Sequence, residues 1–192
     1  MNASSPPPID PVQRRRGRRV LIAIVAIFFG PILLAKLLNM NGLIPAPSTY
    51  GERFDPLIDL RHSPPRLADG SVYDWAPATR MRRLLVVAPA HCTDACVRRA
   101  ADLEKLREIF GRDAEHIELL WLGDYPAGAA RPPGMRFLAD DAALRARLPK
   151  STDPSGAPIY VVDPYGFVIL RYPPEADIAL MRKDLARLLK MQ

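Results

Sequence analysis

The sequence lacks internal repeats, and beyond its first 40 residues it also lacks an excess of basic charge. The whole chain carries a net charge of +6, but residues 1–19 supply +4 of it through five arginines and one aspartate, and residues 40–192 carry about +1. A protein that binds nucleic acid needs a basic face on its folded part, so we expect no nucleic-acid partner. With 192 residues and 48% hydrophobic residues, the chain is too short for two large domains, and we expect one folded domain with appendages.

A long apolar run follows the N-terminal arginines. Val20 to Leu38 contains one charged residue, Lys36, whose long side chain is able to reach the membrane interface. About 20 apolar residues span a bilayer as a helix, and Gly30 and Pro31 are tolerated in such a helix. We therefore expect a basic, proline-rich cytoplasmic arm over 1–19 and a transmembrane helix over 20–39, with the rest of the chain outside, in the periplasm of a bacterium. The alternative is a cleaved signal peptide, but "AKLLNMNG" offers no small-x-small cleavage site.

The rest of the chain divides into a linker and one domain. Residues 40–65 mix proline, glycine and charge without a sustained period, which is typical of a linker. Residues 66–192 show the patterns of regular structure. Continuous apolar runs after Arg82 and after His116 indicate strands that are buried on both faces.

Turn and helix signals complete the expected order of elements. Asp69-Gly70 predicts a hairpin in "RLADGSVYDW", and a second hairpin is expected in "APIYVVDPYGFVILRY". Helices are expected from the cysteines to Gly111, near 141–148, and at the C-terminus. This order predicts an α/β fold in which a mixed sheet has helices on both faces and the functional residues lie at the carboxyl ends of parallel strands.

Both cysteines, Cys92 and Cys96, lie where a buried strand is expected to meet a helix. If the helix begins near Thr93, their β-carbons are about 5–6 Å apart, whereas a disulfide requires about 3.5–4.5 Å, so bridging needs a small adjustment of the first turn. The amino end of a helix stabilises a thiolate at the first cysteine. A thiolate serves redox exchange and soft-metal binding equally well, and a passive disulfide formed after export is the third possibility, although so short a ring is a weak constraint.

The three histidines give little further direction. His91 precedes the cysteine pair and is the candidate third ligand for a metal, but a histidine in such a place is more commonly a surface or packing residue. His62 and His116 have weaker claims because they lie far from the cysteines in the sequence.

Several segments together resemble one known family. The course "LADGSVYDW…RRLLVVAPAHCTDAC…IELLWLGD…APIYVVDPYGFVILRY" is similar to the Sco/SenC group of membrane-anchored, thioredoxin-like proteins that assist copper-centre assembly in cytochrome c oxidase. The resemblance covers roughly residues 66–190. Its most specific parts are the C-x3-C of Cys92 and Cys96 and the segment from Tyr160 to Gly166. It implies a thioredoxin-like fold, the inner membrane as a partner, and a cytochrome c oxidase subunit or another copper-assembly protein as a second partner.

One part of the family pattern is missing. The copper-binding members have a histidine a few residues before the segment written here as "PIYVVD", and this chain has Ser155 or Gly156 in that place. Two thiolates, with His91 or a partner as a third ligand, suit Cu(I) better than Cu(II). Copper, as Cu(I), is therefore the candidate cofactor. The resemblance also implies that Pro158 faces the reactive cysteines, as a proline does in thioredoxin-like proteins.

Three hypotheses of function follow. In the first, the domain assists oxidase assembly through thiol–disulfide exchange or Cu(I) handling, with Cys92 as the attacking thiolate and Cys96 as the resolving thiol or co-ligand. In the second, the domain is a non-catalytic docking module whose cysteines only brace a turn. A weak peroxidase is the third, and no nearby threonine-proline-arginine arrangement supports it.

Overall fold

The computed structural model describes residues 11–40 and 49–190, and it divides into two compact units, 1–48 and 49–192. The first unit contains the helix α1 (Pro11–Met40), which includes the apolar run predicted to be helical. No helix among the described residues meets the combined length and hydropathy expected of a membrane span. The helical conformation of this segment is confirmed, and its place in a membrane stays a prediction.

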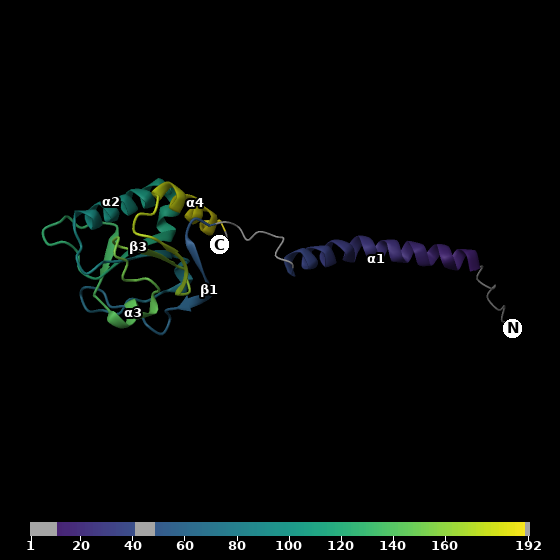
Figure 1. Ribbon diagram of the computed structural model, residues 1–192, viewed down its shortest axis with the longest axis horizontal. Helices are drawn as coiled ribbons and strands as arrows, with labels where there is room; N and C mark the ends of the chain where they lie inside the picture. Colours follow the sequence, from purple (N-terminus) through teal and green to yellow (C-terminus); the bar gives the residue numbers. More distant parts are fainter. Residues whose placement is uncertain (1–10, 41–48, 191–192) are drawn as a thin grey trace. The chain divides into compact units, whose positions relative to one another are not determined.

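The second unit is built around one six-stranded sheet with the strand order β1-β6-β5-β2-β3-β4 (Figure 1). The strands β2, β3 and β4 run parallel to one another, whereas β5 is antiparallel to β2. The strands β6 and β1 continue that side of the sheet, each antiparallel to its neighbour. The strand bounds are β1 (Glu52–Asp59), β2 (Arg82–Val87), β3 (Ile117–Leu122), β4 (Met135–Leu138), β5 (Ile159–Val162) and β6 (Phe167–Tyr172).

Helices cover both faces of this sheet. In Figure 1, α2 and α4 lie above the sheet and α3 lies below it. The helix bounds are α2 (Asp94–Ile109), α3 (Ala142–Arg147) and α4 (Ile178–Leu189), with short 3₁₀ turns η1 (Pro77–Thr79) and η2 (Gly111–His116). The Asp141 and Asp177 carboxylates cap α3 and α4 by accepting two backbone N–H groups each. The predicted mixed sheet with helices on both faces is confirmed.

Two apolar clusters hold these layers together, one on each face of the sheet. Side chains alternate along a strand, so Leu84 and Val86 of β2 point toward α2 and α4, while Leu85 and Val87 point toward α3. All four are fully buried, which explains why β2 reads as a continuous apolar run instead of an alternating one. Both clusters consist of residues from the second unit alone, so this unit has its own complete core.

The structure differs from the sequence-based expectation in two places. The strand β1 lies inside residues 40–65, which we expected to form a linker, and the compact unit begins at Thr49 instead of residue 66. The strand was not predicted because Pro56 interrupts it, and a proline is accepted here because β1 is an edge strand. The hairpin expected at Asp69-Gly70 is a tight turn closed by a single bridge between Arg66 and Val72, not a pair of sheet strands.

Candidate redox site at the carboxyl end of strand β2

The two cysteines form a disulfide between the end of β2 and the start of α2. Their Cα atoms are 5.7 Å apart, within the usual range of about 4.4–6.8 Å for disulfides. The helix begins at Asp94 with Thr93 as its N-cap, so Cys92 lies before the helix and is not bound by the spacing of a regular helical turn. This position provides the adjustment that the sequence-based geometry required.

The two sulfur-bearing residues differ in exposure. Cys96 lies one turn inside α2 and is 5% exposed, whereas Cys92 is half-buried at the edge of the core. The Thr93 side chain makes no capping hydrogen bond, although its carbonyl accepts hydrogen bonds from the Cys96 and Val97 N–H groups. The helix amino end therefore faces Cys92 without a capping side chain between them, and its partial positive charge favours a thiolate there on reduction.

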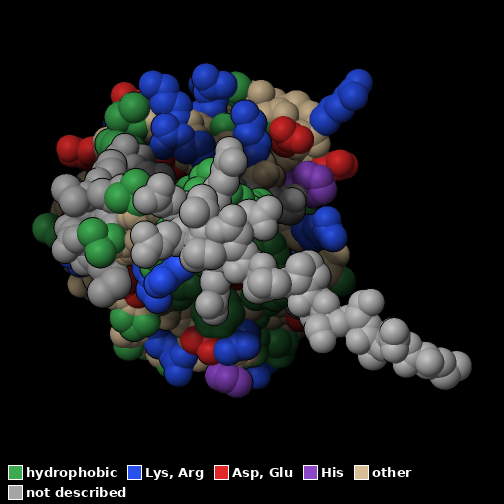
Figure 2. Space-filling model, turned by 90° about the vertical axis from the view of Figure 1, so that its right-hand side faces the viewer, with side chains coloured by type: hydrophobic (Ala, Val, Ile, Leu, Met, Phe, Trp, Pro, Cys, Tyr) green, Lys and Arg blue, Asp and Glu red, His purple; other side chains and the backbone are tan. Residues whose placement is uncertain are grey.

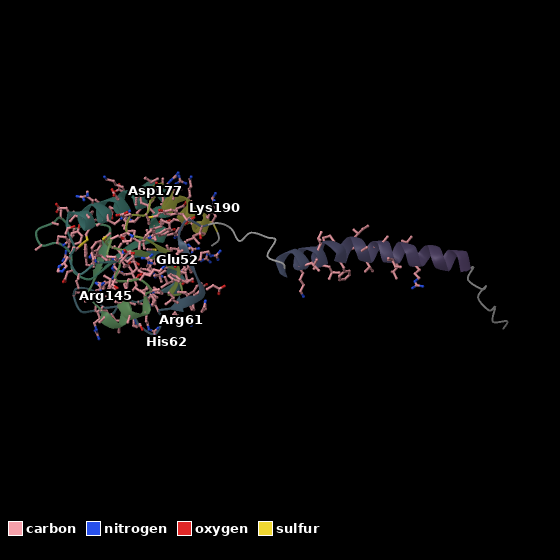
Figure 3. All side chains as sticks on the ribbon, in the orientation of Figure 1. Glu52, Arg61, His62, Arg145, Asp177 and Lys190 are labelled. Carbon is pink, nitrogen blue, oxygen red and sulfur yellow. A yellow bond between two sulfur atoms is a disulfide. The ribbon has the colours of Figure 1, made fainter. Side chains whose placement is uncertain are left out.

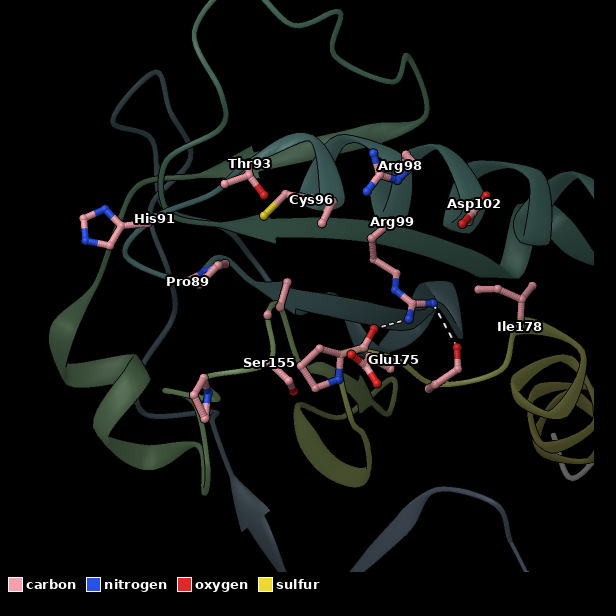
Figure 4. Close-up of a pocket in the computed structure, with 16 residues that line it drawn as sticks. Pro89, His91, Thr93, Cys96, Arg98, Arg99, Asp102, Ser155, Glu175 and Ile178 are labelled. Carbon is pink, nitrogen blue, oxygen red and sulfur yellow. Dashed lines mark hydrogen bonds between the residues drawn. The ribbon is translucent and has the colours of Figure 1, made fainter.

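A pocket of about 520 Å³ opens beside this disulfide (Figure 4). One wall is the start of α2, including Thr93, Cys96 and Arg99, and the opposite wall comes from two loops, 154–157 and 174–176. Cys96 and Ser155 thus lie on the same pocket, although 59 positions separate them in the sequence. The fold brings the cysteine pair next to the segment in which the family pattern has its histidine.

Ser155 is held by a local network. Its hydroxyl donates to Asp153 Oδ1 at 2.6 Å, and its N–H donates to the same oxygen at 3.0 Å. The other carboxylate oxygen of Asp153 accepts from the buried Arg171 at 2.6 Å. The hydrogen bonds from Ser155, with help from Arg171, lower the pKa of Asp153 below its ordinary value. The Ser155 hydroxyl is therefore engaged away from the disulfide.

The second candidate ligand, His91, lies at the edge of the pocket and is exposed. Its ring points away from Cys96 in Figure 4. It also borders a neighbouring pocket of about 540 Å³ on the α3 side, which contains Asp124, Asp140 and Arg145. His91 thus lines both pockets. To bind a metal ion together with the cysteines, its side chain would have to rotate toward them.

The other two histidines lie elsewhere. His62 follows β1 and lies beside Arg61 at the lower edge of the domain in Figure 3. His116 ends η2, with its Nε2 3.8 Å from a Glu115 carboxylate oxygen. Neither is among the residues that line the two pockets. Across residues 11–40 and 49–190, no three His, Cys, Asp or Glu side chains are grouped in a way that would hold a metal ion.

Pro158 lies at the start of β5, directly after the pocket-lining Ala157. It is buried, and its carbonyl accepts the Val87 N–H at 3.0 Å, which joins it to the end of β2. Within the described part of the chain the one cis peptide bond is Asp55–Pro56, so the bond before Pro158 is trans. Pro158 therefore links the pocket-lining Ala157 to the end of β2, and a direct role against the cysteines stays a prediction.

Arg99 is a site residue that the sequence did not single out. Its guanidinium donates to the Ala176 carbonyl at 2.9 Å and to the Pro174 carbonyl, both on the opposite wall (Figure 4). Burial lowers the pKa of Arg99 relative to an exposed arginine. Its position three residues after Cys96 on one helix face was the available signal, because residues at this spacing are neighbours. Arg99 fixes the distance between the two walls of the pocket.

The geometry agrees with the comparison to protein-family models. A model described as "Transmembrane-like, thioredoxin-like, C-terminal domain" matches residues 83–192, which is more than half of the chain, and the protein belongs to this family. A second model, "Transmembrane-like, N-terminal domain", matches residues 11–38. No curated protein shows significant similarity to the chain.

Solved structures with a similar fold include copper-bound Sco proteins. Yeast Sco1 with copper bound has a TM-score of 0.55 at 12% identity, over 77% of this chain and 96% of that one. Arabidopsis thaliana ScoI with copper bound has a TM-score of 0.50 at 11% identity, over 74% of this chain and 99% of that one. Trgpx in its apo form also has a TM-score of 0.50, at 9% identity, over 69% and 95%. These likenesses establish a Sco-like, thioredoxin-like fold.

Proposed function

We propose that the protein is a membrane-anchored, periplasmic thioredoxin-like factor that assists assembly of the copper centre of cytochrome c oxidase. It acts through thiol–disulfide exchange or Cu(I) transfer at Cys92 and Cys96. The observation that carries the proposal is the disulfide between a half-buried and a buried cysteine at an uncapped helix start, beside an open pocket. The copper-bound Sco structures of the same fold support it.

In the proposed exchange reaction, the two thiols of this protein reduce one disulfide of the partner. Starting from the dithiol form, the Cys92 thiolate attacks a disulfide of the partner, forms a mixed disulfide and releases one partner thiolate. The Cys96 thiolate then attacks the Cys92 sulfur, which releases the second partner thiol and forms the Cys92–Cys96 disulfide seen here. Two electrons pass to the partner, whose cysteines become free to bind copper. An external dithiol reductant returns the pair to its starting state.

Copper handling uses the same two sulfurs. Copper is cargo in this proposal, and the reduced pair supplies two thiolates, a donor set that suits Cu(I). No imidazole joins the two thiolates in the arrangement described. Position 155 is a serine whose hydroxyl donates to Asp153, and the His91 ring points away from Cys96. The purified domain is therefore expected to bind Cu(I) more strongly than Cu(II), and Ser155→His is expected to raise the affinity for Cu(II).

Rapid alkylation tests the redox proposal. In the reduced protein, a brief pulse of iodoacetamide at neutral pH is expected to label Cys92 before Cys96, because Cys92 is more exposed and faces the helix amino end. Mass spectrometry of the peptides gives the ratio. Equal or negligible labelling of both cysteines would favour the alternative in which the domain is a docking module of an assembly complex and the disulfide only braces the turn.

The anchoring part of the proposal has a separate test. It is supported by the apolar run from Val20 to Leu38 after the arginine cluster and by the family description of residues 11–38. A reporter that is active only in the periplasm is expected to work after Gln192 and to be silent before Val20. The opposite pattern would overturn the orientation.

A further inference from the structure

Beyond its exposed N-cap residue Asp177, whose carboxylate accepts the Ala179 and Leu180 N–H groups, the helix α4 presents only basic charge to solvent. Its exposed charged side chains, together with that of its C-cap residue, are Arg182, Lys183, Arg187 and Lys190, which we call the basic face of α4. The single acidic residue of the helix, Asp184, is 2% exposed and lies on the buried side. Between Ile178 and Lys190, the positive charge of this face is therefore not balanced by an exposed acid.

Helical geometry places these residues on one side. At 3.6 residues per turn, positions 182, 183, 187 and 190 fall within an arc of about 140°, and the buried Met181 and Leu185 fall on the other side, against the core. Figure 2 shows Lys and Arg side chains gathered along the upper part of the domain, the level at which α2 and α4 lie in Figure 1.

Stability of the helix explains only half of this pattern. Basic side chains near the C-terminus of a helix interact favourably with its dipole, which accounts for Arg187 and Lys190, and Arg187 also lies 3.9 Å from Asp184. Arg182 and Lys183 lie in the middle of the helix, where the dipole has little effect. No salt bridge joins either of them to another residue in the described ranges.

The chain enters the domain beside this helix. The Gly51 N–H donates to Asp184 Oδ2 at 3.0 Å, and the Tyr50 hydroxyl accepts the Asp177 N–H at 3.0 Å. A side chain on residue 51 would meet the ring of Tyr172 in β6, so a glycine lets the entering chain pass close to this ring, whose hydroxyl donates to Asp184 of α4. The first described residues of the domain therefore lie next to α4.

We propose that the basic face of α4 binds the anionic phospholipid headgroups of the membrane that holds α1. The inference rests on the anchoring proposed above, since an anchor keeps the entry point of the domain, and with it α4, close to the bilayer. Lys and Arg side chains near an anionic surface are attracted to it, and this attraction decays within a Debye length. Ile178 in the first turn of α4 and Cys96 line the same pocket, so this docking would fix the orientation of the redox site relative to the bilayer.

Vesicle co-sedimentation tests the proposal with residues 49–192, which contain both apolar clusters and all six strands. The domain is expected to bind vesicles of phosphatidylcholine that contain phosphatidylglycerol, to ignore pure phosphatidylcholine, and to be released by about 0.5 M salt. The triple variant Arg182→Gln, Lys183→Gln, Arg187→Gln is expected to lower the partition coefficient about 100-fold, from the loss of three surface charges.

A matched variant removes the same net charge from the α3 side. Arg66→Gln, Arg147→Gln, Lys150→Gln alters three exposed residues and is expected to leave the partition coefficient unchanged. Equal losses in the two triple variants, absence of binding, or equal binding to neutral vesicles would each overturn the proposal. If the α4 variant does not fold, as judged by near-UV circular dichroism, the single reversal Lys183→Glu replaces it. The fragment lacks α1 and the assay involves no thiol chemistry, so these outcomes leave the tests of anchoring and of thiol exchange independent.

Discussion

The two ends of β2 have opposite surroundings: the amino end is buried in a polar network, and the carboxyl end borders an open pocket. At its amino end, Arg83 is 1% exposed and donates hydrogen bonds to the Tyr73 hydroxyl and to the carbonyls of Trp75, Met81, Asp163 and Pro164. At its carboxyl end, the chain leaves the sheet into a loop with a disulfide, a half-buried cysteine and an open pocket. The amino end therefore carries a polar network that stabilises the fold, whereas the carboxyl end carries a site that is accessible to a partner.

The network at the amino end of β2 contains ion pairs to Glu118 as well as hydrogen bonds. Tyr73 donates to the Glu118 carboxylate, whose second oxygen accepts from Arg136 at 2.9 Å. Burial and the neighbouring Glu118 raise the pKa of Tyr73 above its usual value, so its hydroxyl keeps the proton that it donates. Arg83 Nε lies 3.6 Å from Glu118. Because the buried Arg83 cation is held by these partners, removing it should strongly destabilise the fold. We see no ligand-binding role for this network.

The largest effect is therefore expected at the closed end. Arg83→Met removes a buried cation from Glu118 and leaves several carbonyls without a donor, and it should lower the free energy of unfolding by about 3–5 kcal/mol. Urea denaturation of the domain measures the change. Arg136→Gln is the matched control: it removes the exposed partner of the same carboxylate and should cost less than about 1 kcal/mol. An Arg83→Met variant as stable as the wild type would contradict the stabilising role of the network.

At the open end, removal of the disulfide should cost less. Cys92→Ser, Cys96→Ser opens a small ring, for which chain entropy gives at most about 2 kcal/mol. Urea denaturation measures the loss of stability, and the same shift should follow when the wild type is reduced with a phosphine. A loss as large as that of Arg83→Met would show that the disulfide is a structural brace, which favours the docking-module alternative.

Arg99 connects the open end to the rest of the fold, and its removal should have a moderate effect. Arg99→Gln leaves the Ala176 and Pro174 carbonyls without their donor, with an expected cost of about 1–2 kcal/mol. Hydrogen exchange of the Ala176 and Asp177 amides should become faster, because the loop loses its tie to α2. Arg98→Gln, one residue earlier and exposed, is the control and should change neither quantity. Unchanged exchange in Arg99→Gln would show that the loop is held by other contacts.

The smallest expected effect is the pH dependence of the free energy of unfolding that arises from Asp153, the partner of Ser155. The pKa of Asp153 is lowered in the folded state, first by the hydrogen bonds from Ser155, so its carboxylate stabilises the fold above the unfolded value of about 3.9. This contribution, less than about 1 kcal/mol, is lost as the pH falls through the lower folded value. Urea denaturation at several acidic pH values should show the wild type and Asp153→Asn converging as the pH falls. A constant difference between them would contradict this assignment.

Most of the fold was readable from the sequence because burial on two faces produces continuous apolar runs. The runs after Arg82 and His116 are the strands β2 and β3, and the turn at Asp163–Gly166 joins β5 and β6. The strand β1 was missed because an edge strand with one exposed side and a proline carries no such signal. The strand β4, the parallel neighbour of β3, was also missed, because four residues are too few to show a hydrophobic period.

The site was only partly predictable. The expected position of Cys92 and Cys96 between a strand and a helix is confirmed, because the change from an apolar run to a helical period marks that junction. That Ser155 lies on the same pocket as Cys96 depends on the long-range approach of the loop 154–157 to the start of α2, and the family resemblance, not the local pattern, indicated it. Arg99 was missed because its partners are backbone carbonyls, which leave no residue-type signature in the sequence.

The position of β1 also determines how the domain responds to mechanical load. Tension from the segment before Thr49 reaches the fold first at the contacts of Tyr50 and Gly51 with α4. It then reaches β1, an outermost strand that, among the described residues, pairs with β6 alone. The strands β6 and β5 stand between β1 and β2. If a partner pulls on the tethered domain, β1 is therefore the element that detaches, and β2, the strand that leads to the disulfide, keeps both of its neighbours.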